Sequence, residues 1–283
     1  MIGFLIVDKP QGITSHDVVL IVRKLVGRTV KVGHTGTLDP LATGVLILSV
    51  GKATRLSKYL LKRDKTYRVK GRFGLTSPTY DIDGELSSVE CREISREELL
   101  AALPRFTGEV VQFPPPYSAL RVKGKRAYQL AREGKKVELP PRTVKIYSIE
   151  LLSYSYPDFE LMVHCSSGTY IRSLVHDIGE VLGCSAVVAE LRRVCVGNIC
   201  EDEAVPLHLL KERGVEPFLK PPQEVLCFPV VELSEREERL FRNGAALLKT
   251  LPPGLYSVLS RSGAFLGVGK SNGEVLKPET VIA

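Results

Sequence analysis

The sequence contains no apolar run long enough to cross a membrane. Its longest apolar stretch, residues 41–50, is far shorter than the roughly 20 residues that a membrane-spanning helix needs. The opening residues carry no basic segment ahead of their short apolar run, which ends at Asp8, so they do not resemble a secretory signal peptide. These absences favour an intracellular, cytoplasmic protein that makes no contact with a membrane.

Sequence patterns for metal and nucleotide chemistry are also missing. The six cysteines include no C-x-x-C pair, and the five histidines show no H-E-x-x-H spacing. We therefore predict no metal site and no disulfide framework, and expect reduced, mostly buried thiols. Gly51-Lys52 is followed by Ala53 instead of Ser or Thr, which excludes a Walker-type phosphate loop.

Positive charge is abundant and gathered in blocks. The 283 residues have a formal net charge of +7 and a pI near 9.0. Residues 1–74 hold 14 Lys and Arg against 4 Asp and Glu, and residues 119–147 hold 9 against 2, whereas residues 75–110 are acidic. Such blocks indicate a surface that faces a polyanion, usually nucleic acid. A solvated basic face without a partner is the alternative.

The hydrophobic pattern predicts alternating strands and helices, followed by a small β-rich tail. Strands are expected near residues 4–8, 45–50, 67–73 and 159–165, and helices near 15–26 and 169–182. A Pro-rich segment at 213–224 resembles a linker. From about residue 226, strand patterns are interrupted by the turn sequences RNG (242–244), PPG (252–254), RSG (261–263) and SNG (271–273).

The segment GHTGTLDPLATG (33–44) is the strongest local signal for chemistry. A glycine-rich turn before a buried strand can expose a side chain, and Asp39 is its only carboxylate. His34 lies five residues earlier, so an acid–base pair is conceivable. The alternative is that Asp39-Pro40 only begins a turn.

Two further positions could contribute to a site around that carboxylate. Arg172 stands near the start of a helix, where the helix dipole favours negative charge, so a carboxylate or phosphate neighbour would explain it. An arginine beside Asp39 would hold the carboxylate ionised as a nucleophile. Tyr67, which lies among basic residues on a predicted strand, could stack on a nucleic-acid base. A surface arginine and an ordinary strand tyrosine are the alternatives.

Taken together, these segments resemble the TruB family of pseudouridine synthases, which convert uridine to pseudouridine in the T loop of tRNA. The matching stretches run in family order and cover most of residues 3–197. They are LIVDKPQGITSHDVV (5–19), KVGHTGTLDPLATGVLIL (31–48), KTYRVKGRFG (65–74), DIDGE (81–85), PPPYSALRVKGKRAYQLAREG (114–134) and CSSGTYIRSLVHDIGEVLGCSAVVAELRRV (165–194).

The resemblance implies an α/β (α+β) fold with a mixed, mainly antiparallel sheet flanked by helices, and a small C-terminal PUA-like β-barrel that binds RNA. We expect a catalytic domain at 1–212 with a mobile basic flap at about 114–145, a linker at 213–225 and the RNA-binding domain at 226–283. We also expect a monomer with no obligatory protein partner.

Site residues are also implied by the resemblance. Asp39 matches the catalytic aspartate, Arg172 the arginine that pairs with it, and Tyr67 the aromatic residue that packs on the target base. The substrate-binding positions are Tyr170 in GTYIR, Leu191 lining the uridine pocket, His34 entering the T loop as the base leaves, and Lys9 bordering the pocket.

Breaking the glycosidic bond and rejoining the base through C5 is redox-neutral, so no cofactor is expected. Asp39 could attack C6 of the base or generate a glycal from the ribose. Tyr67 is the preferred acceptor of the C5 proton, although a phenol with a pKa near 10 needs assistance to act as a base. Extracting the base from its loop costs a few kcal/mol.

We predict an enzyme that isomerises uridine 55 in the T stem-loop of tRNA without a guide. The alternatives are a guide-RNA-dependent synthase with protein partners, an RNA-binding or RNA-folding protein without turnover, and a histidine–aspartate RNA hydrolase.

Overall fold

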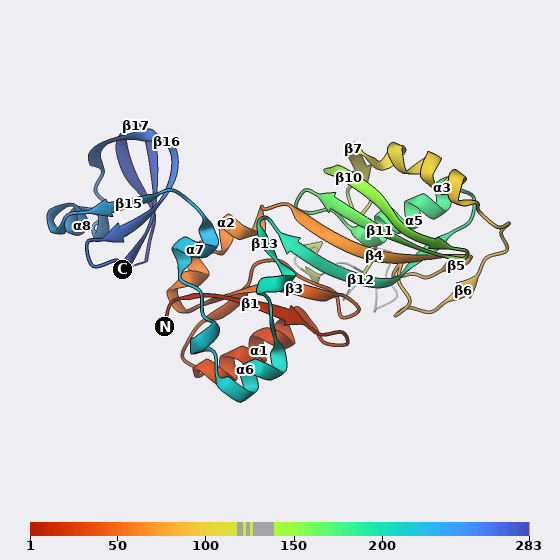
Figure 1. Ribbon diagram of the computed structural model, residues 1–283, viewed down its shortest axis with the longest axis horizontal. Helices are drawn as coiled ribbons and strands as arrows, with labels where there is room; N and C mark the ends of the chain where they lie inside the picture. The colour runs from red at the N-terminus through yellow and green to blue at the C-terminus, as the bar shows by residue number, and fades with distance from the viewer. Residues whose placement is uncertain (118–120, 123–124, 127–138, 283) are drawn as a thin grey trace.

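A computed structural model describes residues 1–117, 121–122, 125–126 and 139–282 (Figure 1). Its main feature is a sheet of ten strands in the order β14-β1-β3-β12-β4-β11-β10-β7, with β13 added to β12 and β2 to β3. The strands are β1 (Gly3–Lys9), β2 (Val32–His34), β3 (Thr43–Val50), β4 (Lys65–Phe73), β7 (Gly108–Gln112), β10 (Arg142–Ser155), β11 (Asp158–Cys165), β12 (Ala186–Val196), β13 (Ile199–Cys200) and β14 (Val205–Pro206).

Pairing within this sheet is antiparallel except for β14 with β1 and β12 with β3. The mixed, mainly antiparallel sheet that the family resemblance implied is therefore confirmed. The β12–β3 pairing is short, because only Arg192 lies opposite Thr43 and Arg193 opposite Gly44. This short pairing joins two larger parts of the sheet.

Helices cover the sheet because each presents one apolar face. Helix α1 (Ser15–Val26) begins at Thr14, whose side chain accepts from the Asp17 backbone in a capping box, and it buries Val18 and Val22. Helix α5 (Ile171–Val181) buries Leu174 and Ile178 beneath β12 and β4. Helix α6 (Leu207–Arg213) packs beside α1, and α3 (Arg96–Ala102) lies near the β7–β10 edge (Figure 1).

Strand β1 is buried on both faces, which gives the molecule two cores at this end. Leu5 and Val7 face α1, whereas Phe4 and Ile6 face a second cluster. That cluster includes η1 (Gly51–Leu56) and α2 (Ser57–Leu61), together with Val268 and Ile282 of the C-terminal region. The C-terminal domain is therefore packed on the ten-stranded sheet through a shared apolar core.

The small C-terminal domain contains a three-stranded sheet of β15 (Val230–Leu233), β16 (Leu247–Ser260) and β17 (Phe265–Val281), with α8 (Glu235–Arg242) beside it (Figure 1). The turn at 261–263 separates β16 from β17 as predicted. The breaks predicted at 252–254 and 271–273 are wrong, because these glycine- and proline-containing segments oppose each other as irregularities within two long strands. The RNG sequence ends α8 rather than a strand.

The residues predicted as a linker are packed on the ten-stranded sheet. Lys220 and Phe4 exchange two backbone hydrogen bonds, of 2.8 and 2.9 Å, and Val215 and Val225 are buried. This connection contains η4 (Glu216–Phe218) and α7 (Pro222–Leu226). Most of the predicted flap, 114–145, lies outside the described residues.

The remaining short elements are β5 (Leu75–Thr76), β6 (Ser87–Ser88), η2 (Leu103–Phe106), β8 (Arg121–Val122), β9 (Lys125–Arg126) and η3 (Glu201–Glu203). No helix in the described part of the chain is both long and apolar enough to span a membrane.

The prediction of reduced cysteines is wrong for four of the six. Cys91 is bonded to Cys184, and Cys195 to Cys200, whereas Cys165 and Cys227 are free thiols. The second bond crosses the β12–β13 pair, in which the two cysteines are directly opposite. Sequence spacing could not show either pairing, because folding brings the partners together.

Candidate active site

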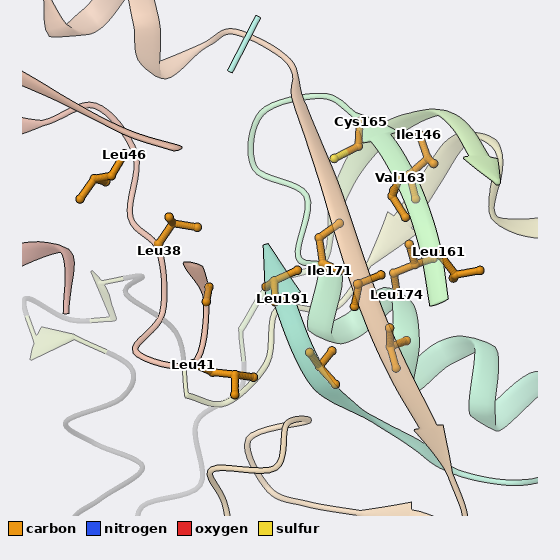
Figure 2. Close-up of a cluster of buried hydrophobic side chains, with 14 of the residues drawn as sticks. Leu38, Leu41, Leu46, Ile146, Leu161, Val163, Cys165, Ile171, Leu174 and Leu191 are labelled. Atoms are coloured by element: carbon orange, nitrogen blue, oxygen red, sulfur yellow. The ribbon is translucent and has the colours of Figure 1, made fainter. Parts of the chain in front are cut away.

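Asp39 lies on a loop that two buried leucines fix in place. Leu38 and Leu41, each 3% exposed, belong to the same apolar cluster as Leu191 and Ile171 (Figure 2). The side chain of Asp39, placed between the two leucines, remains 39% exposed. The two leucines therefore anchor the loop in the core while the Asp39 carboxylate stays partly exposed, as the glycine-rich pattern predicted.

Ser15 secures the same loop from the first turn of α1. Its buried hydroxyl donates to the Leu38 carbonyl at 2.9 Å and accepts from the Leu38 N–H at 2.8 Å. Because both polar groups of Leu38 are satisfied by one side chain, the position of the neighbouring Asp39 is tied to α1. The sequence analysis did not identify this contact, because it joins two segments that are distant in the chain.

Arg172 is the partner of Asp39. Its guanidinium lies 2.8 Å from the Asp39 carboxylate and 3.3 Å from that of Asp81. It also donates to the carbonyls of Thr79 at 2.8 Å and Tyr117 at 3.0 Å. Arg172 is only 5% exposed, so these four acceptors replace water around a buried cation. The unusual arginine at the start of α5 therefore has the carboxylate neighbour that its placement suggested.

Asp81 was not singled out from the sequence, although it stands in the DIDGE stretch of the family match. It is 4% exposed, and it accepts from the Thr79 hydroxyl and from the Asp83 N–H at 3.2 Å. These bonds fix the carboxylate beside Nη1 of the Arg172 guanidinium. Nη2, the other terminal nitrogen of the guanidinium, pairs with Asp39.

Tyr67, on β4, packs against the apolar cluster that contains Leu38 and Leu41. Burial raises the pKa of its phenol, and the Arg193 guanidinium, which is hydrogen-bonded to it, opposes that rise. Arg193 is itself buried and donates to the carbonyls of Val45 at 2.7 Å and Gly36 at 3.1 Å. Arg193 therefore connects Tyr67 to the Asp39 loop, a link that the sequence did not reveal.

Lys9 is the last residue of β1 and is completely buried. Its ammonium donates to the carbonyls of Pro10 at 2.8 Å, Ile13 at 2.6 Å and Pro40 at 3.3 Å. Burial lowers its pKa to about 8, while the negative charge of Asp39 acts in the opposite direction. The bond to Pro40 makes Lys9 a support of the loop directly beside Asp39.

A groove of about 450 Å³ is lined by residues of β4 and β12 and by Leu41, which follows Asp39 by two positions. Leu41 and Leu191 line its apolar part, and Arg68, Lys70 and Arg72 line its charged part. Two carboxylates share the charged part, because Glu160 lies 3.8 Å from Arg68 and Glu190 lies 3.8 Å from Lys70. The three basic residues alternate along β4 with Val69 and Phe73, which are buried on the other face. The groove combines an apolar surface that fits a base with cations that fit phosphates.

The two remaining predicted residues lie at the ends of their elements. Tyr170 is the N-cap of α5, two residues before Arg172, and its backbone N–H donates to the Gln112 side chain at 3.0 Å. The Arg142 guanidinium lies 5.6 Å from the centre of its ring. His34, which is half-buried, is the last residue of β2 and precedes the Asp39 loop.

Family models match three consecutive parts of the chain. Residues 23–171 match the TruB family pseudouridylate synthase N-terminal domain, and residues 172–217 match the tRNA pseudouridylate synthase B C-terminal domain. Residues 229–282 match the C-terminal part described as pseudouridine synthase II TruB. All seven predicted site residues except Lys9 lie at or between positions 34 and 191, within the first two matches.

Individual relatives agree with these matches over the whole chain. The tRNA pseudouridine synthase B of Clostridium tetani is 39% identical, with 98% of each chain covered, and that of Aquifex aeolicus is 41% identical, with 100% of each covered.

Similar solved structures include an H/ACA RNP bound to a substrate RNA that contains 2'-deoxyuridine, at 25% identity and a TM-score of 0.72. A Cbf5-Nop10-Gar1 complex is similar at 28% identity with the same TM-score. Each alignment covers 99% of this chain and 85% of the other.

Proposed function

The chain belongs to the TruB family of pseudouridine synthases, and from this premise we propose that it isomerises uridine 55 in the T loop of tRNA to pseudouridine. The observation that carries the proposal is the ion pair between the half-exposed Asp39 and the buried Arg172. Two residues after Asp39, Leu41 lines a groove with apolar and charged walls. A nucleophile that is fixed in this way can meet a base taken out of its loop.

Asp39 acts as the nucleophile, by attack on C6 of the uracil or by forming a glycal from the ribose. Arg172 orients the carboxylate and stabilises its charge through a charge-assisted hydrogen bond. Tyr67 packs on the target base and accepts the C5 proton. The reaction neither consumes nor releases electrons overall, so the mechanism uses no cofactor.

Binding residues surround these three. Leu191 lines the space that holds the detached uracil, Lys9 borders it, and Tyr170 contributes from the start of α5. His34 enters the T loop as the base leaves. The cations of β4 contact the phosphates, as do those of the 114–145 flap, which closes on the RNA, and the C-terminal region acts as a PUA-like RNA-binding domain.

We expect the protein to act as a monomer on the T stem-loop of tRNA in the cytoplasm, without a protein partner. A guide-RNA-dependent synthase is the second candidate, because one of the similar structures is an H/ACA RNP and another is a Cbf5-Nop10-Gar1 complex. The stand-alone function is favoured because full-length relatives named tRNA pseudouridine synthase B are about 40% identical, compared with 25–28% for those structures.

The test is tritium release from an unmodified tRNA transcript labelled at C5 of uridine, with the purified protein alone. We expect one equivalent per tRNA from intact strands, no release with Asp39→Asn, and normal release with Asp202→Asn, a change at an exposed position of η3. Tight binding without release would contradict a stand-alone enzyme, and strand cleavage would indicate a hydrolase.

A further inference from the structure

The loop that carries Asp81 contacts helix α5 at two points. Arg172 and His176 are one helical turn apart, so they lie on the same face of α5. The loop meets the first through Thr79 and Asp81, as described above. Between those residues, the ring of Tyr80 stacks on the imidazole of His176, with ring centres 4.0 Å apart and planes within 6°.

The backbone at Tyr80 has an unfavourable conformation. Its φ is +61°, in the left-handed region that a bulky side chain rarely adopts. The loop is also joined to β12, because the Ile82 N–H donates to the Val188 carbonyl and the Val188 N–H donates to that of Tyr80, both at 3.0 Å. Strain of this kind persists when surrounding contacts require it, and it is concentrated at functional sites.

Both rings of the stack are neutral near pH 7. Burial lowers the pKa of His176, and burial, with the charges of Asp177 and Glu180, raises the pKa of Tyr80. The contact is therefore a packing interaction between two flat rings, and a side chain of similar shape can replace either one.

We infer that Tyr80 and His176 form a positioning pair, whose stack holds the 79–81 segment on α5 so that Asp81 and Thr79 keep the Arg172 guanidinium directed at Asp39. The inference rests on the proposed function of Asp39. Thr79 and Asp81 contact Arg172, and the residue between them, Tyr80, packs on His176 instead. Loss of either ring frees the segment to move, and a displacement of about 1 Å at a catalytic group can reduce a rate by up to about 100-fold.

The experiment compares ring-removing with ring-preserving variants under single-turnover conditions. Tyr80→Gly adopts the positive φ without strain, so the fold is retained while the ring is lost. We expect Tyr80→Gly and His176→Ala each to slow pseudouridine formation about tenfold at unchanged tRNA affinity, and the double variant to be no slower. Tyr80→Phe and His176→Phe should restore the rate to within about threefold.

A matched control is provided by Tyr147, whose ring lies against His164 at 4.8 Å and whose hydroxyl donates to Asp64. Tyr147→Ala should leave the rate unchanged. Wild-type rates in Tyr80→Gly and His176→Ala would overturn the inference, as would a Tyr80→Phe rate as slow as that of Tyr80→Gly.

Hydrogen exchange of the Ile82 amide separates this inference from the proposed function. It should be at least about tenfold faster in Tyr80→Gly than in the wild type if the stack holds the loop. An inactive wild-type protein would refute the proposed function, whereas unchanged Ile82 exchange would refute the positioning pair.

Discussion

Gly44 lies against the backbone of Arg193, where β3 meets β12. A Cβ atom at position 44 would collide with the Arg193 carbonyl oxygen, and the φ of Gly44 is +95°. Both observations require glycine at this position. The contact has a consequence for the site, because it brings the strand that follows Asp39 against the strand that carries Leu191 and Arg193.

Gly44→Ala should therefore destabilise the protein strongly. We expect a loss of about 3 kcal/mol or more in the free energy of unfolding, from backbone strain and steric overlap together. The measurement is urea denaturation. Gly27→Ala is the matched control, because Gly27 has a φ of +98° but nothing within 4 Å of an added Cβ, and it should cost about 1 kcal/mol. Equal losses would show that the contact with Arg193 is unimportant.

Arg172→Lys should abolish most of the activity while leaving the charge in place. A single ammonium cannot reach Asp39, Asp81 and two carbonyls from one position, as the planar guanidinium does. We expect a single-turnover rate at least about 100-fold lower, with tRNA affinity within a few-fold of wild type. Arg92→Lys, at an exposed bidentate pair with Glu98, should not change the rate. Substantial activity in Arg172→Lys would show that charge alone suffices.

Local structure was largely predictable because it depends on neighbouring residues. The strand near 67–73 and the helices near 15–26 and 169–182 follow from side-chain periodicity, and β4, α1 and α5 lie at these positions. The pairing of Asp39 with Arg172 needed the family resemblance as well. Helix-dipole reasoning indicated an anion near Arg172 but could not choose among the carboxylates of the chain.

The contributions of Asp81 and Arg193 could not be predicted for a related reason. Each acts through a contact between segments that are distant in sequence, and nothing in its local pattern identifies the partner. The two disulfide bonds were not predicted for the same reason. In the C-terminal domain, proline and glycine indicated turns at 252–254 and 271–273. Both segments instead lie within β16 and β17, which pair with each other on either side of them.

Ser15→Ala should reduce turnover more than its loss of stability suggests. The substitution leaves the buried Leu38 N–H without its acceptor, which costs about 1–3 kcal/mol. Because Leu38 precedes Asp39, we expect a roughly tenfold lower single-turnover rate at a temperature where the variant is fully folded. Ser49→Ala, at another fully buried hydroxyl, should destabilise without slowing catalysis. Equal effects of the two variants on the rate would argue against a specific link through Leu38.

Asp177→Asn should stabilise the protein at neutral pH. Burial, reinforced by the charge of Glu180, raises the pKa of Asp177 from 3.8 to about 6. Between these values the folded state binds more protons than the unfolded state, so this residue makes stability fall as pH rises from about 4 to about 6. After allowance for solvent screening, the gain should be about 1 kcal/mol at pH 7 and absent below about pH 4.

Asp158→Asn is the control of opposite sign. Its hydrogen bond from Arg72 lowers the pKa of the carboxylate, so its contribution is present above the ordinary pKa and is lost as pH falls through the lowered value. This variant should be destabilised at pH 7, and the difference should shrink in acid. Melting curves at pH 4, 5, 6 and 7 measure both changes, and the same sign for the two variants would refute the assignment.

Tyr67→Phe should separate base stacking from proton removal. The phenylalanine ring still packs on the target base, so tRNA affinity should be retained, whereas the acceptor of the C5 proton is lost and the rate should fall by about 100-fold or more. Since burial raises the pKa of Tyr67, only a small fraction is phenolate at neutral pH, and that fraction grows tenfold per pH unit. The wild-type single-turnover rate should therefore rise with pH from 6 to 9, with a logarithmic slope near one.

Lys9, with a pKa of about 8, also loses its proton within this range, so the profile is repeated in Lys9→Arg, which keeps the charge. A slope that persists in Lys9→Arg and disappears in Tyr67→Phe assigns the proton transfer to the phenol. A flat wild-type profile, together with a Tyr67→Phe rate close to wild type, would assign it to another group and leave Tyr67 as a stacking surface alone.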